Sequence, residues 1–285
     1  MNRTITLTIA LSAIIFTVSC SKKHTTPLVV TSDSVHLDKL HNQLYGTDSV
    51  YQIMDILYHP NSDNSRPLII LIHGGSWVRG SKDDFSYTGV DTFFAQNGYV
   101  VASINFRLFN TFTYTNEIED IGNAINYLIT NAATWHIDTN RISLLGRSSG
   151  AHLAMLYGYK MNVGMKIKSI VDCYGPTDLT DTSIRKRSFD SSVSYVFGDY
   201  TANQLNWRNN SPSYFAGAAI PTLIMHGTTD TLVPFTQAKL LADSLIAKNV
   251  PCTFIPWENS GHNWNADYWT RDRNTVLAFV NKYGK

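Results

Sequence analysis

The sequence predicts an α/β protein with a mostly parallel sheet flanked by helices, and three features of the chain indicate this class. Apolar runs of strand length alternate with segments of helical periodicity, the order that right-handed crossovers between parallel strands require. The 285 residues are 44% hydrophobic, enough for a substantial core in one domain. A Gly-x-Ser-x-Gly pentapeptide joins one strand to one helix. We therefore expect functional residues at the carboxyl ends of the strands.

A separate module precedes the predicted domain. Arg3 is followed by an apolar stretch over residues 5–18 that is too short for a comfortable membrane span. The stretch ends in Thr17-Val18-Ser19-Cys20, which resembles a bacterial lipoprotein signal, although that motif usually has leucine where Thr17 stands. An ordinary cleaved signal peptide is the alternative. The expected parts are a lipoprotein signal peptide (1–19), a tether (20–35) and a globular domain (36–285).

The composition limits the partners. Lipidation of Cys20 would make this an exported bacterial lipoprotein, periplasmic or at the cell surface, that meets the membrane only through its anchor. The net charge is +1, and no basic patch indicates a nucleic-acid partner. Cys173 and Cys252 lie in predicted strands with another strand expected between them, so we expect buried thiols and no disulfide.

The first half of the domain alternates strands and helices. Residues 50–58 alternate partly in polarity, and residues 67–72 and 99–106 are apolar runs typical of buried strands. Residues 85–97 fit an amphipathic helix that Gly98 ends. A second helix is predicted over residues 117–133, with one apolar face formed by Ile118, Ile121, Ile125 and Leu128.

The second half repeats the alternation. The predicted strands are 141–145, 167–174, 222–225 and 251–256, and the predicted helices are 151–157, 234–248 and 266–283. Residues 180–219 break this rhythm because they are polar and aromatic without a clear strand. They are either a segment that shapes the substrate site or a helical excursion that only packs on the surface. Charges in this segment interrupt the apolar face that a lipase lid needs.

The sequence Gly146-Arg147-Ser148-Ser149-Gly150 lies between the predicted strand 141–145 and the helix 151–157. A sharp strand-to-helix turn strains the middle residue and exposes its hydroxyl above the sheet. The glycines on either side let the strand and the helix approach closely. Ser148 is therefore the candidate nucleophile.

The other groups that an activated serine needs follow in the expected order. Asp230 lies after the strand 222–225 and His262 after the strand 251–256, so they are the candidate acid and base. Upstream, the strand 67–72 runs into His73-Gly-Gly-Ser-Trp77. Backbone N–H groups of this loop, together with that of Ser149, can stabilise a developing negative charge.

Other polar and aromatic residues near these loops receive structural interpretations. We expect His73 to hold its own loop, His152 to brace the oxyanion loop and His226 to pack. Asp172 and Asp178 are rival acids, the second more suited to a cap. Ring stacking on a substrate and ordinary packing both remain open for Trp77, Trp257 and Trp264.

Four segments together resemble α/β-hydrolase-fold esterases of the carboxylesterase and hormone-sensitive-lipase-like group: His73-Gly-Gly-Ser-Trp77, Gly146-Arg-Ser-Ser-Gly-Ala-His-Leu153, Tyr174-Gly-Pro-Thr-Asp-Leu179 and Ser260-Gly-His262. The resemblance extends from about residue 50 to the end. It is strongest to the domain named for bifunctional feruloyl and acetyl xylan esterases, and kynurenine formamidases are similar too.

The resemblance implies an α/β-hydrolase fold with an eight-stranded sheet and an insertion after the sixth strand. It implies Ser148, Asp230 and His262 as the catalytic triad. It also implies oxyanion donors at Gly75, Ser76 and Ser149. Ser76 replaces a common glycine and Ser149 the usual alanine, but both keep the backbone N–H.

These residues predict a serine hydrolase, and the resemblance implies an esterase that cleaves acetyl or feruloyl-type esters of a small or acylated saccharide substrate. The chemistry needs no cofactor, and the sequence offers no cluster of metal ligands. The alternatives are an amidase, peptidase or formamidase-like hydrolase on the same fold, a lipase, and a catalytically inactive binding protein.

Overall fold

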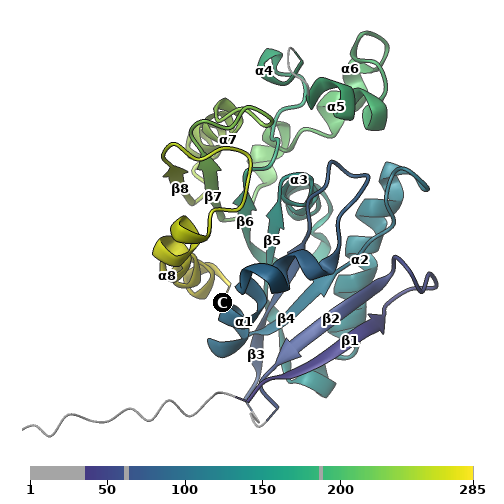
Figure 1. Cartoon of the computed structure of the whole chain (residues 1–285), viewed down its shortest axis with the longest axis vertical. Helices are drawn as coiled ribbons and strands as arrows, with labels where there is room; N and C mark the ends of the chain where they lie inside the picture. The colour runs from purple at the N-terminus through teal and green to yellow at the C-terminus, as the bar shows by residue number, and fades with distance from the viewer. Residues whose placement is uncertain (1–35, 61–63, 186–188, 285) are drawn as a thin grey trace, which may run out of the picture. The chain divides into compact units, whose positions relative to one another are not determined.

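A computed structural model of the chain describes residues 36–60, 64–185 and 189–284 (Figure 1). The predicted signal peptide, Cys20 and the tether therefore lie outside the described residues. Within the described part, no helix combines the length and the apolar character that crossing a membrane requires.

The centre of the domain is an eight-stranded sheet in the order β1-β2-β4-β3-β5-β6-β7-β8. Pairings from β4 through β8 are parallel, and β2 is antiparallel to both of its neighbours. The predicted mostly parallel eight-stranded sheet is confirmed. The strands are β1 (Asp38–Leu44), β2 (Ile53–Tyr58), β3 (Arg66–Ile72), β4 (Val100–Ile104), β5 (Ile137–Arg147), β6 (Ile167–Cys173), β7 (Thr222–Gly227) and β8 (Cys252–Trp257).

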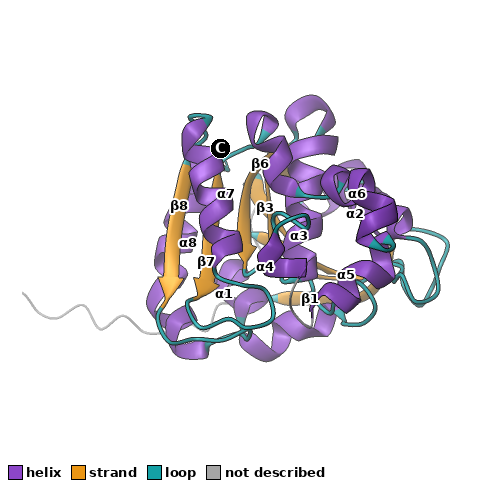
Figure 2. Cartoon of the chain, turned by 90° about the horizontal axis from the view of Figure 1, so that it is seen from above, coloured by secondary structure: helices purple, strands orange, loops and turns teal. Residues whose placement is uncertain are grey.

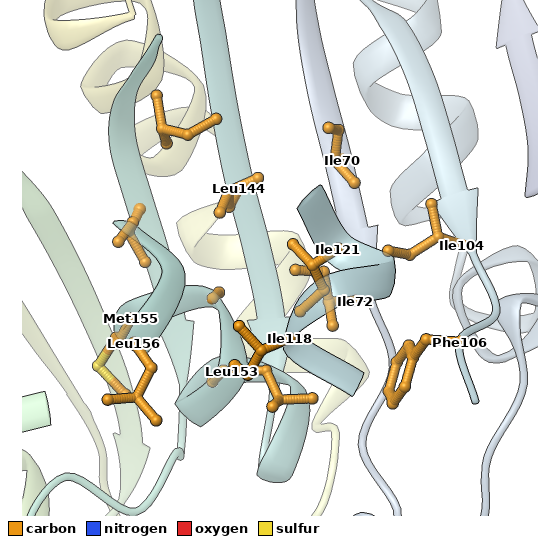
Figure 3. Packing of buried hydrophobic residues seen from close by; sticks show 14 of the residues in the cluster. Ile70, Ile72, Ile104, Phe106, Ile118, Ile121, Leu144, Leu153, Met155 and Leu156 are labelled. Atoms are coloured by element: carbon orange, nitrogen blue, oxygen red, sulfur yellow. The ribbon is translucent and has the colours of Figure 1, made fainter. Parts of the chain in front are cut away.

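Helices cover both faces of the sheet (Figure 2). One face is covered by α1 (Val90–Gln96) and α8 (Ala266–Tyr283), and the other by α2 (Tyr114–Thr130), α3 (Ser149–Leu156) and α7 (Thr236–Ala247). Side chains of β3 alternate between the two cores: Ile70 and Ile72 face α2 and α3, while Ile69 and Leu71 face the other side. Figure 3 shows Ile72 beside Ile121 of α2, and Ile118 beside Leu153 of α3.

Three elements differ from the expectation. Strand β1 has no apolar run, because it is an edge strand that pairs only with β2. The helix predicted over 85–97 is divided at Gly89, whose φ of 66° ends η1 and begins α1. Strand β5 begins at Ile137, four residues before the predicted start.

The short helical turns are η1 (Lys82–Thr88), η2 (Ala132–Trp135), η3 (Tyr157–Met161), η4 (Val163–Met165) and η5 (Pro212–Ala218).

The insertion follows the sixth strand, as predicted, and contains α4 (Thr182–Arg185), α5 (Phe189–Phe197), α6 (Tyr200–Asn209) and η5. Figure 1 shows α4, α5 and α6 grouped at one end of the domain. Phe189, Phe197 and Trp207 are buried in the core cluster that also contains α2 and α3. The insertion therefore packs as part of the domain.

Candidate active site

Ser148 occupies a strained turn between β5 and α3. Its φ of 51° and ψ of −122° lie outside the regions that L-residues favour. The backbone N–H of Ser148 donates to the Cys173 carbonyl oxygen at 2.9 Å, which ties the turn to β6. A Cβ on Gly150 would lie 2.2 Å from the His73 oxygen, so only glycine allows α3 to approach β3 this closely.

The three predicted triad residues come together at the carboxyl ends of β5, β7 and β8. The Ser148 hydroxyl lies 2.9 Å from Nε2 of His262. Nδ1–H of His262 donates to Oδ2 of Asp230 at 2.7 Å. Ser148 and Asp230 are each only 6% exposed, so most water is excluded from this line of hydrogen bonds. The arrangement can carry a proton away from the Ser148 hydroxyl.

The Asp230 carboxylate is held by its own loop as well as by His262. Its Oδ1 accepts the backbone N–H groups of Leu232 and Val233, each at 2.9 Å. Burial alone would raise the pKa of Asp230, but hydrogen bonds from His226 and His262 outweigh burial and lower it. The lowered pKa keeps the Asp230 carboxyl group ionised near neutral pH.

The loop after β3 is bent by a run of unusual backbone angles. Gly75, Ser76 and Trp77 have φ values of 121°, 53° and 64°. A Cβ on Gly75 would lie 2.0 Å from the Arg79 oxygen, so glycine is required at this bend. Nδ1–H of His73 donates to the Gly74 carbonyl oxygen at 2.7 Å, which confirms that His73 holds its own loop.

Of the three residues predicted as oxyanion donors, two line the cavity and one does not. Gly75 and Ser76 line the same cavity as Ser148 and His262. Ser149 begins α3 directly after Ser148 and does not belong to the lining residues. As the first residue of a helix, it has a backbone N–H without an acceptor in its own helix.

His152 braces the oxyanion loop, as expected. Nε1–H of Trp77 donates to Nδ1 of His152 at 3.3 Å, and Nε2–H of His152 donates to the Asn210 carbonyl oxygen at 2.6 Å. Burial lowers the pKa of His152 to about 4, against a smaller raising effect of the Asn210 carbonyl, so the ring stays neutral. Phe189 and Phe197 pack against Trp77, so the insertion supports this loop.

The cavity above Ser148 has a volume of about 520 Å³ and mixed polar and aromatic walls. Sequence reasoning assigned no role to several of the residues that line it: Arg79, Asp84, Tyr87, Arg147, Tyr174 and Leu232. Because these residues come from separate loops, no periodicity in the sequence indicates that they meet.

Arg147 joins two loops beside Ser148. Its guanidinium carbon lies 3.8 Å from the Trp264 ring centroid and 4.4 Å from that of Phe85. Its Nη2 donates to the Thr88 hydroxyl at 2.6 Å. Burial lowers the pKa of Arg147, although nearby acidic groups oppose this. Arg147 thus connects the Ser148 turn to η1 and to the loop that carries His262.

The two rival acids and the other residues near these loops have structural contacts. Trp77 and Trp257 are buried, so packing accounts for them. Asp178 accepts hydrogen bonds from the backbone and hydroxyl of Thr180, as expected for a capping residue. Asp172 is buried and accepts the Gly175 N–H at 2.8 Å. His226 does more than pack, because its Nε2 lies 3.2 Å from Oδ2 of Asp230.

Comparisons with known proteins agree with this fold. Esterase LipC of Mycobacterium tuberculosis is 28% identical over 239 residues, and a probable isoprenylcysteine alpha-carbonyl methylesterase of Arabidopsis thaliana is 23% identical over 228. The alignments cover 78% and 73% of this chain but only 59% and 54% of those relatives. The chain thus spans little more than half of their length.

Among solved structures, a truncated carbohydrate esterase from gut microbiota matches with a TM-score of 0.76 at 22% identity, over 88% of this chain and 99% of that one. This likeness supports the predicted α/β-hydrolase fold. A family model named BD-FAE matches residues 54–245, which is more than half of the chain. The chain therefore belongs to the BD-FAE family.

Proposed function

We propose that this chain is a serine esterase that hydrolyses short-chain acyl esters through an acyl-enzyme intermediate. The observation that carries the proposal is the unbroken line of hydrogen bonds from Ser148 through His262 to Asp230, which reaches an open cavity. The strained backbone of Ser148 supports it, since such strain is common at functional residues. The names of the two curated relatives, both esterases, support the reaction class.

In this mechanism the Ser148 oxygen attacks the ester carbonyl carbon while its proton moves to Nε2 of His262. Asp230 keeps the other ring nitrogen protonated and stabilises the imidazolium. The proposed donors to the oxyanion are the backbone N–H groups of Gly75, Ser76 and Ser149. His262 then protonates the leaving alkoxide. Water next attacks the acyl-enzyme carbonyl and gives its proton to His262, which returns a proton to the Ser148 oxygen as the carboxylic acid leaves. A histidine that acts as a general base must be neutral to accept the proton, so the pH–rate profile should have a rising limb.

The acyl group that we propose is acetyl or another short chain. Four aromatic residues of the insertion are candidates to contact a feruloyl group, and none of them lines the cavity: Phe189, Phe197 and Trp207 are buried in the core, and Tyr195 is exposed elsewhere. The aromatic walls come instead from Tyr87 and Tyr174. A feruloyl group would therefore have to contact these two rings.

An acylated saccharide is the proposed class of alcohol. Arg79 and Asp84 give the cavity charged groups that can hydrogen-bond to hydroxyls, and Tyr87, which is 87% exposed, offers a ring at the cavity. These walls are less suited to a long alkyl chain, which favours the esterase over the lipase alternative.

Labelling with a fluorophosphonate probe tests the reaction class. Wild type and the control Ser169→Ala, which removes a buried hydrogen bond to the Ser143 hydroxyl among residues that do not line the cavity, should label, and Ser148→Ala should not. No labelling of the wild type would favour an inactive binding protein. Nitrophenyl esters from acetyl to decanoyl then test the acyl group, and matched anilides test the amidase alternative.

We also propose that the chain is a lipoprotein anchored through Cys20. Support comes from the sequence alone, where the apolar stretch ends at Cys20. Expression of the full chain and of Cys20→Ser tests this by membrane fractionation and mass spectrometry of the N-terminus. An unlipidated wild type would leave the ordinary cleaved signal peptide as the interpretation.

A further inference from the structure

A second histidine contacts the same carboxylate oxygen that His262 uses. Nε2 of His226 lies 3.2 Å from Oδ2 of Asp230, and Nδ1 of His262 lies 2.7 Å from that same oxygen. Nε2 of His226 is also 2.9 Å from the Val233 carbonyl oxygen. Because the Val233 carbonyl oxygen can only accept, Nε2 of His226 must carry a hydrogen, and this N–H also lies beside Oδ2 of Asp230.

The surroundings of His226 hold this ring in place. The ring is fully buried and packs edge-on against Phe235, with 6.0 Å between the ring centroids. Asp172 lies on the same face of the sheet, because it pairs with Ile224, two residues before His226. Nδ1 of His226 and Oδ2 of Asp172 are both buried and have no hydrogen-bond partner within the described part of the chain.

Two acids therefore face His226: Asp230 from its own loop and Asp172 from β6. Tyr159 and Cys252 interact with Asp172. Burial raises the pKa of the Tyr159 hydroxyl, and it raises the pKa of the Cys252 thiol to about 11. Both groups stay neutral near neutral pH, so the two carboxyl groups are the ones that can change charge beside this ring.

We propose that His226 is a positioning residue for Asp230. This rests on the proposed function, in which Asp230 is the catalytic acid. The Nε2–H of His226 holds Oδ2 at the place where His262 needs it and withdraws part of the negative charge from that oxygen. Without this donor, Oδ2 is held only by His262 itself, while Oδ1 keeps its two backbone donors. The fuller charge on Oδ2 also stabilises the His262 imidazolium, so His262 keeps its proton to a higher pH.

Two variants of similar size separate these effects. His226→Gln places an amide N–H near the position of Nε2, whereas His226→Asn places its amide near Nδ1 and leaves Oδ2 without the donor. For acetyl nitrophenyl ester, His226→Asn should lower kcat about 10- to 100-fold with little change in KM. The rising limb of the pH–rate profile should move to higher pH by about half a pH unit to one pH unit. His226→Gln should restore most of both losses.

Ring ¹⁵N NMR gives a readout that does not need turnover. In the wild type, His226 should be protonated at Nε2 throughout the active pH range, and in His226→Asn the titration midpoint of His262 should move upward. Ser169→Ala, the control for a lost buried hydrogen bond, should lower the melting temperature without moving that midpoint.

Three results would overturn the proposal: a His226 ring protonated only at Nδ1, an unmoved His262 midpoint in His226→Asn, or equal impairment of the two variants. The first is read on the wild type, so it does not depend on whether the variants fold. Failure of the proposed function looks different. In that case the wild type takes no fluorophosphonate and cleaves no ester, while the NMR differences between the variants remain.

Discussion

Replacing Gly150 by alanine should damage the site through the backbone alone. The added Cβ would lie 2.2 Å from the His73 carbonyl oxygen and 2.3 Å from that of Ile72. Both obstacles are main-chain atoms and cannot rotate away. The first turn of α3 and the end of β3 must therefore separate by roughly 1 Å to reach ordinary contact. These two segments carry Ser148 and the oxyanion loop.

The size of the effect follows from that separation. Overpacking of this kind destabilises a fold by about 1–3 kcal/mol. A misplacement of roughly 1 Å between reacting groups lowers kcat by about 100-fold. Gly150→Ala should therefore lose far more activity than its loss of stability explains at a temperature where the variant remains folded.

The assay pairs thermal melting with kcat and KM for acetyl nitrophenyl ester, using Gly217→Ala as the control. A Cβ on Gly217, within η5, meets no atom within 4 Å, so that variant should stay within about 0.5 kcal/mol of wild type and keep its kcat. A folded Gly150→Ala with wild-type kcat would show that the contact between α3 and β3 does not set the distance from Ser148 to the oxyanion loop.

Three further substitutions test other parts of the site. Arg147→Lys keeps the charge but loses the planar stack on Trp264, so kcat/KM should fall about tenfold; an unchanged kcat/KM would show that the stack does not hold the His262 loop. His152→Phe leaves Nε1–H of Trp77 unpaired, so urea unfolding should show a loss of about 2 kcal/mol, and none would contradict the brace. Burial raises the pKa of Asp172 to about 7, above its unfolded value of about 4. The contribution of Asp172 to the free energy of unfolding is therefore fully present below about pH 4, and it is lost as the pH rises to 7, where the buried carboxyl group ionises. Asp172→Asn should lack that decline, and parallel urea curves of variant and wild type across this range would refute it.

Local sequence signals were sufficient to predict that Ser148, Asp230 and His262 lie together. Ser148, Asp230 and His262 each follow an apolar strand, and parallel strands end at the same edge of a sheet. The polar strand β1 was not predicted, because an edge strand needs no apolar run. The contact between His226 and Asp230 was missed for another reason. A histidine after a buried strand is compatible with packing or bonding, and only the turn of the following loop decides between them.

The insertion shows most clearly what sequence reasoning could not decide. Aromatic residues in a polar segment are compatible with a substrate wall or with a core, because composition does not show which side of a helix faces the domain. Here Phe189 and Phe197 pack against Trp77, and Asn210 holds His152, which in turn holds Trp77. The insertion therefore acts on the site through the oxyanion loop. Because a transition state is stabilised only by donors held in place beforehand, a segment that does not line the cavity still contributes to catalysis in the proposed mechanism.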